Sequence, residues 1–489
     1  MRLSDVLPAE ISPPPGADAI DVVGVTAASA AAAPGMIFAG LPGTRVDGAA
    51  FIPDAVARGA RVVIAARGKA AAVPDGVTLI EVDNPRRALA LIAAKFSGRQ
   101  PACAVAVTGT SGKTSVADFT RQIFTSLGRS AASLGTIGVI KPLGAIYGSL
   151  TTPDPVTLHA TLASLADEGV THLAFEASSH GLDQHRLDGV TLTAAAFTNL
   201  GRDHMDYHPT VEAYLAAKLR LFTELLQPGQ TAVINTDGAF ASDVIAAARA
   251  RGLKIMTVGR DGETLKRLSL ATEGFAQLMR ISAGGRIYDI RLPLVGEYQA
   301  ENALTAAGLA IAAGEDAGRV LATLETLRGV PGRLEIVGEA RGALAIVDYA
   351  HKPEALDAAL SACRPFVTGK LICVFGCGGD RDKGKRPIMG AIAAKNADVV
   401  IVTDDNPRSE VASIIRSEIL SSAPGAIEIG DRAEAIRQAI AMLANGDVVL
   451  VAGKGHETGQ IIGTTVVPFS DHDEIARALS AIEQGQSHP

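Results

Sequence analysis

A nine-residue segment near the first quarter of the chain constrains the fold more than any other feature. Residues 107–115 read Val-Thr-Gly-Thr-Ser-Gly-Lys-Thr-Ser, after the apolar run Ala102–Val107 and before a helical segment that extends to about Leu127. A strand, a tight glycine turn, a lysine and a hydroxyl residue at a helix start form a cradle for nucleotide phosphates. Val107 stands where the strict G-x-x-x-x-G-K-[ST] motif has its first glycine, so this is the shorter T-G-T-x-G-K-[ST] variant. The segment therefore predicts ATP binding.

The residues of this segment have separate parts in phosphate binding. Backbone N–H groups of the turn would surround the phosphates, the Lys113 ammonium would neutralise their charge, and Thr114 Oγ would bind Mg²⁺. A chance Gly-Lys-Thr turn is the alternative interpretation, which the preceding strand and the following helix disfavour. The predicted ATP-binding residues of the segment are Gly109, Thr110, Ser111, Gly112, Lys113, Thr114 and Ser115.

Chain length predicts three α/β domains. At about 150 residues per domain, a chain of 489 residues has room for three. We place them at residues 1–98, 99–330 and 331–489, with ATP bound by the central one. The N-terminal domain is expected to be small and to hold substrate. Its predicted elements are strands at Asp21–Val25, Met36–Ala39 and Arg61–Ala65 and a helix at Phe51–Arg58.

Strands and helices alternate along the central domain. This pattern predicts an open, doubly wound, mostly parallel sheet whose ligands bind at the carboxyl ends of its strands. Residues Leu265–Leu294 instead alternate between apolar and polar and turn at Gly284-Gly285, which predicts a β-meander. Further strands are expected at His172–Phe175, Ala194–Thr198, Thr231–Asn235 and Lys254–Val258, and helices at Val156–Glu168 and Val211–Leu226.

The C-terminal domain repeats the alternation and is predicted to be Rossmann-like. The segment Gly376-Cys377-Gly378-Gly379-Asp380 follows a strand but lacks the G-x-G-x-x-G spacing, so an NAD-type cofactor is not expected. Predicted strands are Leu344–Val347, Leu371–Phe375, Val399–Val402, Ala426–Ile429 and Val448–Val451, and predicted helices lie near 353–361, 387–396, 410–421, 431–444 and 472–483.

Composition argues against several classes of protein. The net charge is −7 without any block of like charge, so neither nucleic acid nor an anionic membrane is an expected partner. No apolar stretch is long enough to span a bilayer, and the start Met1–Asp5 lacks the pattern of an export signal. The four cysteines lack zinc-type spacing and are expected to be buried thiols in a reducing cytoplasm. They are Cys103, Cys363, Cys373 and Cys377.

Three residues of the central domain could take part in chemistry. Glu176 ends an apolar strand and is placed to hold Mg²⁺; the alternative is a solvated loop carboxylate. His204 also follows a strand, but histidine is an uncommon Mg²⁺ ligand, so spacing alone favours a structural hydrogen bond. Lys218 lies on a helix among small and apolar residues. Burial would favour a neutral amine that acts as a base or reacts with CO₂, whereas the alternative is a surface lysine.

Several motifs together resemble the Mur ligase family. Thr108–Ser115, Glu176–Gly181, Asn199–Asp206 and Tyr214–Lys218 occur in the order seen in these enzymes, and the similarity extends from about residue 24 to 480. In that family the N-terminal domain holds the UDP moiety, the central domain binds ATP and the C-terminal domain brings the amino acid. The chain resembles the members that add meso-2,6-diaminopimelate to the D-glutamate γ-carboxyl of UDP-N-acetylmuramoyl-L-alanyl-D-glutamate. We therefore expect a cytoplasmic, monomeric, ADP-forming ligase of peptidoglycan precursor synthesis.

The resemblance implies roles for individual residues. It makes Thr114, Glu176 and His204 magnesium ligands, directly or through water, and Lys218 an N-carboxylated lysine that bridges metal. With Lys113, the last three form the expected catalytic set. The implied contacts to the muramoyl dipeptide substrate are Thr151, Thr152, Ser178, Gln184 and Arg186, and the implied further contacts to ATP are Asn302, Arg333 and Asp348.

The amino acid that is added should be decided in the C-terminal domain. Asp405-Asn406-Pro407-Arg408 follows a strand, and the Arg408 guanidinium could bind the distal carboxylate of diaminopimelate through two hydrogen bonds. A lysine substrate has no such carboxylate. The alternative is that Arg408 only pairs with Asp404 or Asp405 at the surface. Other positions that match diaminopimelate contacts are Arg381, Gly453 and Glu457.

One departure and three rival functions remain at this stage. The family commonly has Asp-Ser-Arg before a Pro-Gly turn, whereas here only Ser29 matches and Ala30 replaces the arginine. The contact to the nucleotide part of the substrate is therefore expected to differ. A lysine-adding ligase or a folylpolyglutamate-type ligase is the neighbouring alternative, and a P-loop switch or motor is the alternative from another class.

Overall fold

The computed structural model describes residues 1–43, 46–70, 73–146 and 150–483. The chain divides into two compact units, Met1–Val258 with Gly308–Asp316, and Gly259–Ala307 with Ala317–Pro489. Within the described part, no helix combines the length and the apolar character needed to cross a membrane.

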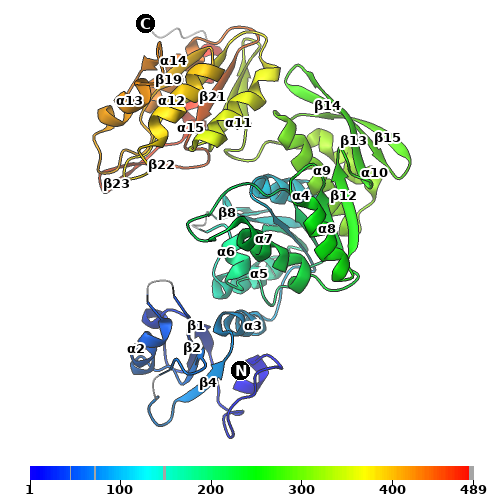
Figure 1. Cartoon of the computed structure of the whole chain (residues 1–489), viewed down its shortest axis with the longest axis vertical. Helices are drawn as coiled ribbons and strands as arrows, with labels where there is room; N and C mark the ends of the chain where they lie inside the picture. The colour runs from blue at the N-terminus through cyan, green and yellow to red at the C-terminus, as the bar shows by residue number, and fades with distance from the viewer. Residues whose placement is uncertain (44–45, 71–72, 147–149, 484–489) are drawn as a thin grey trace. The chain divides into compact units, whose positions relative to one another are not determined.

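The first unit begins with a small parallel sheet in the order β1-β2-β3-β4 (Figure 1). Each strand follows the previous one through a crossover, and apolar clusters cover both faces. The strand expected at Asp21–Val25 begins later, and β4 was not predicted. The elements are α1 (Leu3–Val6), β1 (Gly24–Thr26), η1 (Ser29–Ala31), β2 (Met36–Gly40), η2 (Gly48–Phe51), α2 (Ile52–Ala57), β3 (Val62–Ala66), β4 (Thr78–Val82) and α3 (Pro85–Ser97).

Helix α3 has clear start and stop signals. The Asn84 side chain accepts a hydrogen bond from Arg87 N, Pro85 occupies the first turn, and Gly98 ends the helix at φ +69°. These are the ordinary cap, first-turn and C-terminal residues of an α-helix. The Asn84 cap is used again below, because its amide nitrogen contacts another segment.

The large sheet of the first unit has β5 (Cys103–Thr108) between β10 and β9. From β12 to β6 the strands run parallel in the order β12-β11-β10-β5-β9-β6, and β7 and β8 add an antiparallel edge. The expected doubly wound sheet is confirmed, with β6 to β8 as additions. The other strands are β6 (Ala131–Gly135), β7 (Gly138–Lys141), β8 (Gly144–Ile146), β9 (His172–Glu176), β10 (Ala194–Phe197), β11 (Thr231–Asn235) and β12 (Lys254–Gly259).

The helices of this sheet place the residues discussed below. The expected helix at Val211–Leu226 is divided into two parts, because α7 (Val211–Arg220) is followed by a π-helical turn, η3 (Leu221–Leu225). Such turns are rare and occur often at functional sites. The remaining helices are α4 (Lys113–Ser126), α5 (Pro155–Asp167), α6 (Ser179–Asp183) and α8 (Ala241–Ala250).

The second unit contains the expected β-meander. Strands β13 (Leu265–Glu273), β14 (Ala276–Ala283) and β15 (Arg286–Leu292) pair antiparallel in sequence order. Gly284 and Gly285 form the turn at φ +54° and +76°, in the left-handed region that glycine adopts easily. The helical elements near the meander are α9 (Glu297–Ala312), α10 (Ala317–Thr323) and η4 (Leu324–Thr326).

The rest of the second unit is a Rossmann-like layer structure (Figure 1). Its sheet has the order β16-β17-β21-β18-β19-β20, with only β16 antiparallel, and one apolar cluster lies on each face. The strands are β16 (Glu335–Ala340), β17 (Ala343–Asp348), β18 (Leu371–Phe375), β19 (Val399–Val402), β20 (Ile427–Glu428) and β21 (Val448–Ala452), with a hairpin of β22 (Gly459–Ile462) and β23 (Thr465–Pro468). The helices are α11 (Pro353–Cys363), η5 (Arg364–Phe366), α12 (Lys385–Asn396), α13 (Ala412–Leu420), α14 (Arg432–Ala441) and α15 (Asp471–Glu483).

The cysteines are thiols, as expected. Cys363, Cys373 and Cys377 are buried and Cys103 is partly buried, and all four are free. Burial raises the pKa of Cys363 above its usual range and that of Cys373 to about 12. Cys363, Cys373 and Cys377 are packing residues of the core in the second unit.

Candidate active site

The phosphate-binding loop follows β5, as predicted. Gly109 has φ +149°, and a Cβ atom there would lie 1.9 Å from Thr198 Oγ1. The loop is held from the next strand, because Asn199 Oδ1 accepts a hydrogen bond from Ser111 N at 3.0 Å. Lys113 Nζ donates to the carbonyls of Gly109 and Thr110 at 2.9 and 2.8 Å. A triphosphate would compete with these carbonyls for the ammonium.

Lys218 is buried against the same loop. Its side chain belongs to α7, the residue is 1% exposed, and Nζ donates to Gly109 O at 2.7 Å. Nζ also lies 4.3 Å from the centroid of the Tyr214 ring. Burial holds the pKa of Lys218 well below its usual range, and the nearby Lys113 cation adds to this effect. The alternative of a surface lysine is therefore wrong.

Glu176 is the last residue of β9 and is also buried. Its Oε1 accepts a hydrogen bond from Thr136 N at 2.7 Å, and its Oε2 one from Thr136 Oγ1 at 3.3 Å. A side chain at Gly135 would lie about where this carboxylate is, since a Cβ there would be 2.1 Å from Oε1. At 1% exposure, Glu176 is not the solvated loop carboxylate of the alternative interpretation.

His204 lies in a cluster of rings beside α7. Its backbone is left-handed, with φ +55°, and its ring packs edge-on to His180 at 4.8 Å between centroids. The side chain is 44% exposed and Nε2 lies 3.7 Å from Asp203 Oδ2. Partial burial lowers the pKa of His204, and Asp203 opposes this. The ring thus favours the neutral form, which can act as a ligand.

The side chains of Thr114, Glu176 and His204 fit a magnesium ion only together with a carboxylated Lys218. Among the described residues, no group of three or more His, Cys, Asp or Glu is arranged to hold a metal. The available donors are the Thr114 hydroxyl, the Glu176 carboxylate and the His204 ring. A free ammonium at Lys218, next to Lys113, would repel a cation, whereas a carbamate would supply the missing oxygen ligands that Mg²⁺ prefers. The donor set therefore fits Mg²⁺ when Lys218 is N-carboxylated.

The residues expected to bind the dipeptide substrate lie together at the end of β9. Thr152 Oγ1 donates to Glu176 O at 2.9 Å, and Ser178 Oγ donates to Thr152 Oγ1 at 2.9 Å. Arg186 Nη1 donates to Thr152 O at 2.6 Å and Arg186 Nη2 to Gln184 Oε1 at 2.7 Å. Thr151 Oγ1 lies 3.0 Å from Thr136 Oγ1. All five predicted residues thus join the Glu176 site.

Two residues of this cluster were missed from the sequence. Thr136 follows β6, a strand that was not anticipated, and it touches both Glu176 and Thr151. The Tyr207 hydroxyl donates a hydrogen bond to Asp183 Oδ2 at 2.6 Å and accepts one from Gln184 Nε2 at 3.2 Å. Tyr207 belongs to the His204 loop, so an aromatic residue next to a predicted ligand was the available signal.

Ser29 lies apart from that cluster, in the N-terminal sheet domain. It is the first residue of η1. Its hydroxyl donates to the Asp54 carboxylate, which lowers the pKa of Asp54. The serine therefore has a local partner in Asp54.

The predicted ATP contacts of the second unit also converge. Gln299 joins two of them, because its Nε2 donates to Arg333 O at 2.7 Å while its Oε1 accepts from Asn302 Nδ2 at 3.0 Å. Asp348 Oδ2 accepts from Leu334 N at 2.8 Å. Burial raises the pKa of Asp348 to about 6, with Arg333 opposing the shift. Gln299 was not predicted.

The turn after β19 is organised by a lysine that was also missed. Lys454 Nζ is fully buried and donates to Asn406 Oδ1 at 3.0 Å and Glu457 Oε2 at 3.1 Å. It lies 3.6 Å from Asp405 Oδ1, a buried oxygen without a hydrogen-bond partner among the described residues. The sequence signal that could have identified Lys454 is its position between Gly453 and Glu457, two residues that were predicted to bind diaminopimelate. Three predicted diaminopimelate residues therefore share one buried cation.

Arg408 does not form the surface ion pair with Asp404 or Asp405 that was the alternative interpretation. Its Nη1 donates to Gly379 O at 2.9 Å, and its backbone is left-handed with φ +51°. Asp404 pairs instead with Arg416. Gly453 has φ +117° and lies close to Asp405, whereas Arg381 is exposed and donates to Asp380 O at 3.1 Å. Arg381 is thus a predicted diaminopimelate contact with an exposed side chain.

Three family models match this chain in sequence order. The Mur ligase family, catalytic domain, matches residues 21–97, the Mur ligase middle domain residues 107–310, and the Mur ligase, glutamate ligase domain residues 332–455. A solved structure titled as a UDP-N-acetylmuramoyl-L-alanyl-D-glutamate–2,6-diaminopimelate ligase superposes with a TM-score of 0.75 at 32% identity, covering 99% of each chain. A folylpolyglutamate synthase from Mycobacterium tuberculosis, at 19% identity, shares only the fold, with a TM-score of 0.61 over 83% of this chain and 96% of that one.

Curated relatives extend over nearly the whole chain. A protein of Bradyrhizobium diazoefficiens is 56% identical over 98% of this chain and 99% of its own length. One of Agrobacterium fabrum is 57% identical over 95% and 94%. Both are named UDP-N-acetylmuramoyl-L-alanyl-D-glutamate–2,6-diaminopimelate ligase. With matching models in all three parts and this identity across its length, the chain belongs to the Mur ligase family.

Proposed function

We propose that this protein is an ATP-dependent, ADP-forming ligase that joins meso-2,6-diaminopimelate to the D-glutamate γ-carboxyl of UDP-N-acetylmuramoyl-L-alanyl-D-glutamate. The observation that carries the proposal is the whole-length identity to proteins named for this reaction. The phosphate-binding loop with buried Lys218 and the Asp405–Arg408 turn with buried Lys454 support it from the chain itself. ATP and UDP-linked sugars are cytoplasmic metabolites, so we place the reaction there.

The first step needs neutralisation of charge. A γ-carboxylate oxygen of the D-glutamate attacks the γ-phosphorus of ATP, ADP leaves, and an acyl phosphate results. Both reactants are anions, so Lys113 and the N–H groups of residues 109–115 would hold the phosphates where the charge develops. The cluster that contains Thr152 and Arg186 would position the γ-carboxylate of the D-glutamate. Positioning of this kind can lower a barrier by roughly 7–11 kcal/mol.

Magnesium belongs to the proposal as the counterion of ATP. When bound, Mg²⁺ would offset the negative charge of the phosphates. Thr114, Glu176, His204 and carboxylated Lys218 are the residues that would hold it. The carbamate matters because it turns the Lys218 amine into an anion beside the phosphate-binding loop.

The second step is attack by the amine. The nitrogen of diaminopimelate adds to the acyl carbon, the tetrahedral intermediate expels phosphate, and the amine loses a proton as the amide forms. No side-chain nucleophile is needed. The acyl phosphate hydrolyses if water reaches it, so the site must exclude water during this step.

The choice of amino acid rests on the turn after β19. The Arg408 guanidinium suits the distal carboxylate of diaminopimelate, and the carboxylates of Asp405 and Glu457 suit its distal ammonium. Lys454 already compensates part of the negative charge of these two carboxylates. A site with these groups would bind a zwitterionic end and would leave them unpaired with L-lysine.

The test is an assay of phosphate release with the UDP-muramoyl dipeptide and ATP. We expect release to depend on meso-diaminopimelate and on Mg²⁺, with L-lysine a poor substrate. Strong use of L-lysine would support the lysine-adding alternative. Hydrolysis of ATP that depends on neither amino acid would support a P-loop NTPase switch. Gel filtration of the same sample would test the expected monomer.

A further inference from the structure

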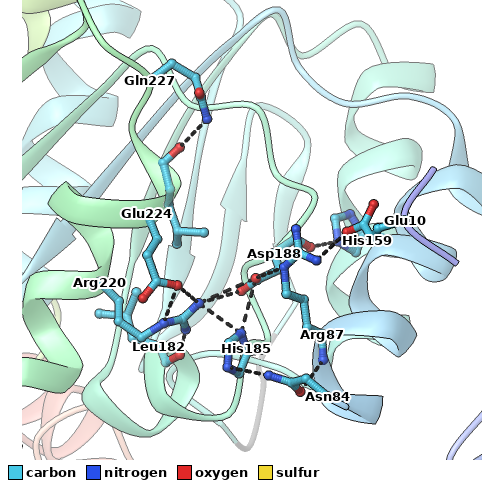
Figure 2. Close-up of polar contacts among 11 residues, drawn as sticks. Glu10, Asn84, Arg87, His159, Leu182, His185, Asp188, Arg220, Glu224 and Gln227 are labelled. Atoms are coloured by element: carbon cyan, nitrogen blue, oxygen red, sulfur yellow. Dashed lines mark hydrogen bonds and ion pairs between the residues drawn. The ribbon is translucent and has the colours of Figure 1, made fainter. Parts of the chain in front are cut away.

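A polar network around Asp188 joins helix α3 to the turn from Leu182 to Asp188 and to the end of α7 (Figure 2). Its central residue, Asp188, has a side chain that is only 6% exposed. Arg220 Nη2 lies 3.3 Å from Asp188 Oδ2, and Arg87 Nε lies 3.5 Å from Oδ1. Its backbone carbonyl also accepts a hydrogen bond from His159 Nε2 at 3.0 Å. One carboxylate therefore faces two guanidinium groups from different elements.

Three polar side chains hold the His185 ring. Asn84 Oδ1 accepts from Arg87 N as the cap of α3, so Asn84 Nδ2 is the atom that faces His185 Nε2, at 2.9 Å. An amide nitrogen only donates, and Nε2 must accept. His185 Nδ1 lies 3.2 Å from Asp188 Oδ1 and 2.9 Å from Arg220 Nη2, so it sits between a carboxylate and a guanidinium. His185 thus connects the cap of α3 to both Asp188 and Arg220.

The same network reaches the residues that hold substrate in the proposed function. His185 lies between Gln184 and Arg186 and has a left-handed backbone, φ +56°. Such a conformation in a non-glycine residue persists only where surrounding contacts stabilise it. Arg220 completes the frame, because Nη1 donates to Leu182 O. The turn from Leu182 to Asp188 is therefore held from both ends by charged side chains.

We propose that Asp188 is a positioning residue for the UDP-muramoyl dipeptide. Through His185 and Arg220 it holds the backbone of the Gln184–Arg186 segment in the conformation that presents both side chains to substrate. Asp188 itself does not touch substrate. The proposal rests on the proposed function for the identity of that substrate.

Asp188→Asn is the principal test. The variant keeps the volume and one acceptor but leaves Arg87 and Arg220 without their shared counter-charge. Misplacement of a binding segment can cost about 100-fold. We expect the Kd for the UDP-muramoyl dipeptide, measured by calorimetry, to rise about 10- to 100-fold, and the Kd for an ATP analogue to stay within about twofold. Asp167→Asn is the matched control, since Asp167 pairs with Arg99 at an exposed site.

Asn84→Ser tests the contact between Asn84 and His185 while keeping the cap of α3. Serine can still cap α3 through its hydroxyl, but it cannot donate to His185 Nε2 across the same distance. We expect an intermediate loss of dipeptide affinity with an unchanged melting temperature.

The outcomes separate the two proposals. Wild-type protein that neither binds the UDP-muramoyl dipeptide nor ligates diaminopimelate would overturn both. Wild-type protein that binds it, with Asp188→Asn and Asn84→Ser binding equally well, would overturn only the positioning role. A lower melting temperature with equal losses of ATP and dipeptide affinity would also overturn it, since that pattern indicates general destabilisation.

Discussion

Lys218 is a side chain whose environment makes the ammonium form costly. It is buried beside Gly109 O, and burial together with Lys113 lowers its pKa well below the usual range. Lys218→Ala should nearly abolish ligation, because the oxygen ligands of the proposed carbamate are lost. High bicarbonate or a short-chain carboxylate should restore part of the activity by occupying the space. Full activity of the variant in the phosphate-release assay would exclude the carbamate.

Arg408 is the residue expected to set amino-acid choice. Removal of one partner of a partly desolvated charge pair costs on the order of 2–5 kcal/mol. Arg408→Ala should therefore raise the KM for diaminopimelate strongly and leave weak use of L-lysine unchanged or improved. Arg408→Lys should retain partial activity, since charge remains but the two-pronged contact is lost. A normal KM in Arg408→Ala would remove Arg408 from the site.

Asp348 should make the second unit less stable as pH rises. Burial raises the pKa of Asp348 to about 6, so the folded state keeps a proton that the unfolded state releases near pH 4. Between about pH 4 and 6 the unfolded state binds fewer protons, and stability falls by up to about 3 kcal/mol. Asp348→Asn, which can still accept from Leu334 N, should lack this decline. Melting temperatures across that pH range, compared between wild type and variant, would check it; parallel curves would contradict it.

At the scale of elements, the phosphate-binding turn depends on a backbone that only glycine fits. Gly109→Ala would place a Cβ 1.9 Å from Thr198 Oγ1 at φ +149°. Gly128, at φ +83° after α4, has nothing within 4 Å of its Cβ position and is the matched control. Gly109→Ala should lose ATP binding in a calorimetric titration. Gly128→Ala should bind normally and lose only about 1 kcal/mol of stability. Equal ATP affinities in both variants would contradict the steric explanation.

The elements themselves followed largely from sequence patterns, with instructive exceptions. Long apolar strands such as Leu371–Phe375 were located well, because a buried parallel strand is apolar throughout. Strands β4 and β6 and the π-helical turn after Arg220 were not, because their stability comes from neighbouring elements. Local sequence carries little signal for such segments.

At the scale of the whole molecule, each compact unit has its own buried core. Arg432 and Asp471 form a fully buried pair in the second unit, with Nε to Oδ1 at 2.7 Å. Loss of one partner of a buried ion pair costs about 3–5 kcal/mol. We expect calorimetry to show more than one transition, and Asp471→Asn to lower only the one that belongs to the second unit. A shift of every transition together would show that the chain unfolds as one cooperative body.

The sequence by itself determined the phosphate-binding loop and the α/β class, because glycine turns and apolar strands are local signals. The candidate substrate residues came from the resemblance to the Mur ligases. Tertiary structure decided the protonation and burial of those residues. The pKa of Lys218 is lowered because α7 packs this residue against Gly109. Thr136, Lys454 and Asp188 each contact partners far along the chain. Burial and long-range pairing depend on the folded arrangement of several elements, so no local pattern could have revealed them.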